Sequence, residues 1–141
     1  MPSVFTMIID GDLPGRFVWK DDRCVAFLSI NPIADGHVLV VPRHQVDHWI
    51  DAEPDLLAHL TAVSRVIGQA LQAAFRRTRI AMVIVGLEVP HLHIHLAPID
   101  TMGDLDFALA DQAPDPDHLD RVADRIREAL RPLGRPETDE G

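Results

Sequence analysis

The amino-acid sequence predicts one α+β domain, with about five mostly antiparallel strands and two main helices. Three observations support this prediction. Short apolar runs bounded by turn residues are typical of strands. Two longer stretches repeat their apolar residues every three or four positions, which is the helical period. No apolar run approaches the roughly 20 residues that a membrane helix needs, whereas a chain of 141 residues can bury a core of its own.

The first half of the chain contains three of the expected strands. Residues 4–9 are apolar and fit either a helix or an extended segment, and residues 10–15 form a turn rich in Asp, Gly and Pro. Alternating or β-branched apolar residues then predict strands over 16–20, 24–30 and 37–42. The first two of these strands are close enough in sequence to form a hairpin.

The second half adds two helices and two strands. Asp51 is the expected cap of a long amphipathic helix that reaches about Arg76. A fourth strand over 80–85 and a short turn precede a fifth strand, which ends near Ile99. A second amphipathic helix is expected over 119–133, because Gly and Pro residues follow it.

Composition and charge restrict the classes of function. We expect a single domain over 1–136, followed by a frayed tail at 137–141. The chain has 22 acidic and 13 basic residues, and its net charge of −9 disfavours binding to nucleic acid. The single cysteine, Cys24, cannot form an internal disulfide, and the N-terminus is unlike a secretory signal. These features predict a cytoplasmic protein without nucleic-acid or membrane partners.

The most informative stretch is residues 90–98, which read PHLHIHLAP. In an extended strand, alternation places His91, His93 and His95 on one face and the intervening apolar residues on the other. A single histidine on a strand is usually structural, but three at a spacing of two align neutral, proton-exchanging nitrogens. The row therefore predicts a functional site.

Two chemistries are compatible with such a row. In the first, histidines bind a metal, but three on one strand span roughly 13 Å, so an ion would need two of them and a distant His37 or His44. In the second, the middle imidazole attacks phosphorus while its neighbours donate to the phosphoryl oxygens. The second chemistry uses all three residues without requiring them to converge on one point.

These residues resemble the signature of the histidine triad (HIT) superfamily, His-x-His-x-His followed by apolar residues. The blocks 25–32 and 36–44 are similar to the strands on the nucleotide side of that family. The resemblance implies a HIT-like fold and a homodimer whose sheets join across the interface. It also implies a nucleotide hydrolase or nucleotidyl transferase that needs no cofactor, closest to the Hint-like branch.

The resemblance further implies roles for individual residues. Four histidines would form the catalytic group: His93 as the nucleophile that becomes nucleotidylated, His95 on the α-phosphate, His91 as support, and His44 as a fourth member that closes the cluster. Many relatives hold structural zinc with two N-terminal cysteines. Val4 and Met7 stand at the expected positions here, so we predict no zinc.

Four residues are expected to bind the substrate. Phe27 and Ile30 would line a pocket for the base, and Ser29 stands where relatives have a ribose-binding aspartate. Glu88 stands near the position of a phosphate-side hydroxyl, where a carboxylate within ~4 Å of a phosphate costs about 1 to 4 kcal/mol. We therefore hypothesise that Glu88 engages a cationic leaving group. The alternatives are a nucleotide-binding module with little turnover and a His-ligated metallohydrolase.

Overall fold

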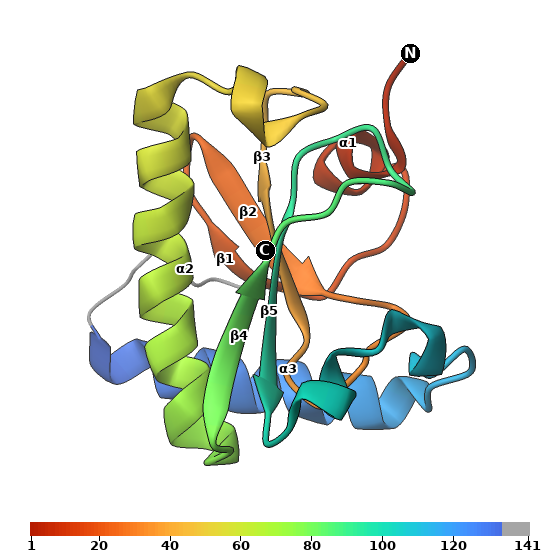
Figure 1. The fold of residues 1–141 in the computed structure, drawn as a ribbon, viewed down its shortest axis with the longest axis vertical. Helices are drawn as coiled ribbons and strands as arrows, with labels where there is room; N and C mark the ends of the chain where they lie inside the picture. Colours follow the sequence, from red (N-terminus) through yellow and green to blue (C-terminus); the bar gives the residue numbers. More distant parts are fainter. Residues whose placement is uncertain (134–141) are drawn as a thin grey trace.

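The computed structural model describes residues 1–133, which form one open sheet with helices against it (Figure 1). The strands follow the spatial order β1-β2-β3-β5-β4, and every neighbouring pair is antiparallel. They span Phe17–Lys20 (β1), Cys24–Leu28 (β2), Val38–Pro42 (β3), Arg79–Val83 (β4) and Ile94–Ile99 (β5). The expected α+β class is confirmed. The tail at 137–141 and the helix stop at Gly134 and Pro136 lie outside the described residues.

Three α-helices accompany the sheet: Val4–Ile9 (α1), Pro54–Phe75 (α2) and Pro116–Leu130 (α3). In Figure 1, α2 runs along the strands and α3 lies across their lower end. The expected cap of the long helix is wrong, because Asp51 lies in a 3-10 turn and α2 begins after Glu53. Pro54 suits this start, since the first helical position needs no backbone N–H. No helix within residues 1–133 is long and apolar enough to span a membrane.

Strand alternation divides the apolar residues between the two faces of the sheet. On β2 and β3, the side chains of Ala26 and Val40 belong to the large core with α2 and α3, whereas Phe27 and Leu39 point to the other face. There they pack with Phe5 of α1 in a smaller cluster. The face opposite the two long helices is therefore covered by α1 over only part of its area.

The histidine segment differs from the expected strand. β5 begins at Ile94, so His91 and His93 precede it. The backbone N–H of Leu92 donates to Val46 rather than to a neighbouring strand, at 2.7 Å. Successive side chains still alternate between the two faces of the sheet in this segment, as shown by Leu92, which is buried in the large core like Ile94.

Candidate active site

Ring contacts join the histidines to one another and to Phe5 of α1. The ring centroids of His93 and His95 are 4.8 Å apart, and His95 is 5.2 Å from His37. Phe5 of α1 lies edge-on to His93 at 4.8 Å and to His91 at 5.8 Å. His95 is positioned by β5, where it pairs with Leu39 of β3.

His91 is fully buried and is bonded at both ring nitrogens. Its Nε2 lies 2.7 Å from the carbonyl oxygen of Pro42, and its Nδ1 lies 2.6 Å from the hydroxyl of Ser3. A carbonyl only accepts, so Nε2 carries the proton, and Nδ1 accepts from Ser3. Burial lowers the pKa of His91, which keeps the ring neutral. His91 lines neither of the two cavities that His93 and His95 both line.

His93 presents one free nitrogen. Its Nδ1 lies 2.7 Å from the backbone carbonyl of His91, so Nδ1 carries the proton and donates. Within residues 1–133, Nε2 has no hydrogen-bond partner and keeps its lone pair. Burial lowers the pKa of His93, although the bond to His91 and the charge of Glu88 act in the opposite direction. A neutral imidazole with a free Nε2 is the form that can act as a nucleophile.

The tautomer of His95 follows from its contact with His37. The backbone N–H of Ile33 donates to Nδ1 of His37 at 3.1 Å, so neutral His37 carries its proton on Nε2. That Nε2 donates to Nδ1 of His95 at 3.0 Å, which leaves the proton of His95 on its own Nε2. Burial is the main cause that lowers the pKa of His37 to about 4 and that of His95 to about 3. His95 therefore offers an N–H donor next to His93.

The four expected substrate-binding residues line one cavity with the histidines. This cavity of about 340 Å³ contains Phe27, Ser29, Ile30 and Glu88 together with His93 and His95. Phe27 is buried beneath it, whereas Ile30 is 67% exposed at its rim. The hydroxyl of Ser29 accepts a hydrogen bond from the backbone of Asn31 at 3.3 Å. A cavity of this size, with few polar groups, is typical of small-molecule sites.

His44 does not join this group in the way that the resemblance implies. It is exposed and lines a separate hollow with Arg43 and Glu53, and only its charge reaches His91. Sequence reasoning named His37 only as a possible distant metal ligand and missed its contact with His95, because only the pairing of β3 with β5 brings the two together. It also missed Phe107, whose ring lies 4.9 Å from that of His95. Phe107 belongs to a short 3-10 turn, Phe107–Leu109, for which the sequence gives no periodic signal.

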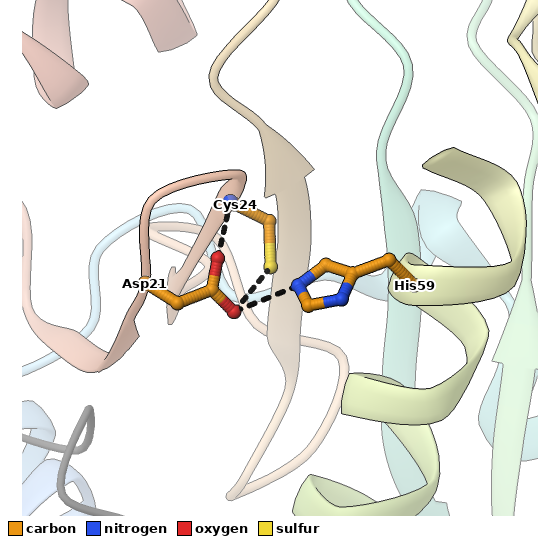
Figure 2. Close-up of side chains that lie close together, drawn as sticks. All are labelled: Asp21, Cys24 and His59. Carbon is orange, nitrogen blue, oxygen red and sulfur yellow. Dashed lines mark hydrogen bonds and ion pairs between the residues drawn. The ribbon is translucent and has the colours of Figure 1, made fainter. Parts of the chain in front are cut away.

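A different set of side chains has the spacing of metal ligands. Among residues 1–133, only Asp21, Cys24 and His59 bring such ligand atoms together, within 4.8 Å of one another (Figure 2). His59 of α2 lies 2.8 Å from the Asp21 carboxylate, and the Cys24 thiol donates to the same oxygen at 3.5 Å.

These contacts join the β1–β2 turn to α2. Burial works to raise the pKa of Asp21, but hydrogen bonds from Trp19, His59 and two backbone N–H groups lower it to about 2. Burial and the nearby carboxylate raise the pKa of the Cys24 thiol, whereas a metal would require the thiolate. None of the three lines the cavities next to His93 and His95, and their hydrogen bonds link the turn to α2.

Comparisons with known proteins agree with this architecture. A family model described as HIT domain matches residues 10–102, which include the whole sheet and all three triad histidines. An uncharacterized HIT-like protein from Mycobacterium tuberculosis strain H37Rv is 34% identical over 143 residues, covering 92% of this chain and 94% of the relative.

Two solved structures share the fold. A Hit-like protein involved in cell-cycle regulation from Bartonella henselae has a TM-score of 0.80 at 27% identity, covering 91% of this chain and 96% of its own. A hypothetical histidine triad nucleotide-binding protein from Sulfolobus tokodaii has a TM-score of 0.83 at 25% identity, covering 96% and 97%. On the sequence match and the shared fold, this chain belongs to the HIT domain family.

Proposed function

We propose that the protein is a nucleotide hydrolase or nucleotidyl transferase that works through a covalent nucleotidyl-His93 intermediate. The observation that supports it best is the order of hydrogen bonds, which leaves a lone pair on Nε2 of His93 and a proton on Nε2 of His95. A nucleophile and an oxyanion donor thus stand side by side at one cavity. The nucleotide-binding description of the Sulfolobus tokodaii protein agrees with a nucleotide ligand.

The reaction has two displacements at the α-phosphorus. The lone pair of His93 Nε2 forms a bond to phosphorus, and the bond to the leaving group breaks with its electron pair. The leaving group then takes a proton from water. In the second step, water attacks phosphorus, the His93–phosphorus bond breaks, and the water proton is released. The N–H of His95 donates to a phosphoryl oxygen in both steps, and His91 holds His93 in its reactive tautomer.

Trapping of the intermediate tests this proposal. We expect a purine nucleoside phosphoramidate, labelled on the nucleoside, to leave an acid-labile adduct on His93 that mass spectrometry can locate. His93→Ala should abolish the adduct and lower kcat by at least 10³-fold. Binding without an adduct or turnover would instead favour a nucleotide-binding module. One equivalent of bound zinc with chelator-sensitive turnover would favour the metallohydrolase.

A homodimer joined through β4 is part of the same proposal. β4 pairs only with β5 within the described chain, and its Met82 is 54% exposed. An unpaired edge with exposed apolar side chains is a ready site for pairing with a second chain. We expect sedimentation to show a dimer. Met82→Glu should shift it to monomer and raise the dissociation constant of the dimer at least tenfold. Met102→Glu, at an exposed position outside β4, should leave the dimer intact, and a monomeric parent protein would contradict the proposal.

A further inference from the structure

Two cavities meet at the reactive histidines. The first, of about 340 Å³, extends towards Ser29 and the end of β2. The second, of about 370 Å³, lies on the side of the loop after β4 and is lined by Val85, Leu87 and their neighbours. His93, His95, Glu88 and Phe107 line both cavities. A phosphorus atom at His93 Nε2 would therefore adjoin both cavities.

Of the aspartate, glutamate, lysine and arginine residues within residues 1–133, Glu88 alone lines these cavities. No lysine or arginine of the described part of the chain lines them to neutralise a phosphate. Glu88 is exposed on the loop 84–93, so its carboxylate can contact a ligand directly. Its charge also reaches His93, where it opposes the effect of burial on the ring. An anionic substrate without a compensating charge would be repelled at this point.

Apart from Glu88, His93 and His95, the residues that line the second cavity are apolar. Val85 is 48% exposed, Leu87 is 90% exposed, and Phe107 is 39% exposed, which leaves hydrocarbon surface available around the carboxylate. A ligand with an apolar stem and a positive end matches such a surface, because the stem covers the hydrocarbon and the cation pairs with Glu88.

We propose that the second cavity binds the leaving group, and that Glu88 selects substrates whose leaving group carries an ammonium or guanidinium on an apolar stem. This inference rests on the proposed attack by His93. It assigns the nucleoside to the cavity at Ser29 and a cationic amine to the cavity at Leu87. The positive end of the leaving group offsets the repulsion between Glu88 and the phosphate.

Three substrates of equal length test the inference. They are adenosine 5′-phosphoramidates of 1,4-diaminobutane, n-pentylamine and 5-aminopentanoate, whose stems end in an ammonium, a methyl group and a carboxylate. We expect kcat/KM to fall in that order, with at least a tenfold difference between ammonium and carboxylate that shrinks at high salt. Glu88→Gln should reduce this difference to less than threefold, and Glu88→Lys should invert it. Asp12→Asn removes the same charge from an exposed turn outside both cavities, and it should preserve the preference.

The results separate this inference from the proposed function. If all three substrates form the His93 adduct at equal rates, the role of Glu88 is overturned while the mechanism survives. If no substrate forms an adduct, the mechanism fails. Calorimetric affinities of the same compounds for His93→Ala then decide on Glu88. The inference is supported if His93→Ala binds the ammonium compound more tightly than the other two and the double variant His93→Ala/Glu88→Gln does not. Equal affinities of the three compounds for His93→Ala overturn it.

Discussion

The ring of His91 takes no part in lining the cavity, yet it determines what His93 can do. The backbone carbonyl of His91 accepts a hydrogen bond from Nδ1 of His93. The ring of His91 is held by hydrogen bonds to Pro42 and to Ser3, a residue 88 positions earlier. The segment 91–93 lies before β5, so a strand ladder does not hold that carbonyl in place. Three hydrogen bonds therefore position the ring of His93, whereas strand pairing positions His95.

Replacing Ser3 tests this arrangement. Ser3→Ala removes the donor that lies 2.6 Å from Nδ1 of buried His91 and leaves only the hydroxyl of Thr6, at 3.5 Å. A buried acceptor without a well-placed donor costs about 1–3 kcal/mol. The substitution also removes the side-chain cap of α1. We expect a lower free energy of unfolding in urea and a lower kcat, both largely restored in Ser3→Thr.

Ser64→Ala is the matched control. Ser64 is also buried, but its hydroxyl has no hydrogen-bond partner within residues 1–133. Its removal should leave stability unchanged or raise it, because no bond is lost. Equal destabilisation by the two substitutions would contradict the role of Ser3.

At the level of elements, the turn between β2 and β3 ends immediately before His37. Gly36 in this turn has a φ of +92°, which side-chain-bearing residues rarely adopt. A Cβ there would lie 2.9 Å from Cε2 of Phe75 and 3.0 Å from Cγ of Pro98. The turn thus needs glycine both for its backbone conformation and for its close approach to α2 and β5.

Gly36→Ala should therefore destabilise the protein more than Gly11→Ala. Gly11 has a similar φ of +87° but open space around it, so only the backbone strain of about 1–2 kcal/mol applies there. At Gly36, overpacking adds about 1–3 kcal/mol. Urea denaturation of both variants measures the difference, and equal midpoints would show that Phe75 moves aside without cost.

At the level of the whole molecule, burial of neutral imidazoles makes stability depend on pH. Burial is the main cause that lowers the pKa of all four clustered histidines, to about 4 for His37 and about 3 for His95. The unfolded chain takes up protons at these histidines near pH 6.5, whereas the folded chain takes them up at His37 only near pH 4 and at His95 only near pH 3. The folded state therefore loses stability as pH falls from about 6.5.

We expect the free energy of unfolding to fall between pH 6.5 and about 4. Each such histidine contributes up to about 1.4 kcal/mol per pH unit, because the unfolded state binds one more proton. His37→Gln should reduce this slope, whereas His48→Gln, at an exposed position, should not. Thermal unfolding across this pH range is the measurement, and a flat profile in the parent protein would contradict the assignment of neutral rings.

The sequence by itself determined the fold class, the approximate extent of most elements and the side on which each triad residue lies. These depend on apolar periodicity, which acts between near neighbours, so Leu92 and Ile94 reach the core even where the strand is irregular. The prediction that Asp51 caps the long helix was wrong, because α2 begins later, at Pro54.

Only the tertiary structure decided which distant groups meet. His37 and His95 lie 58 positions apart, and it is the β3–β5 pairing that places them within hydrogen-bond distance, while exposed His44 lies at another hollow. The position of Glu88 between two cavities likewise depends on the path of the loop after β4. Contacts across such sequence distances follow from strand order and loop path, which local residue patterns do not specify.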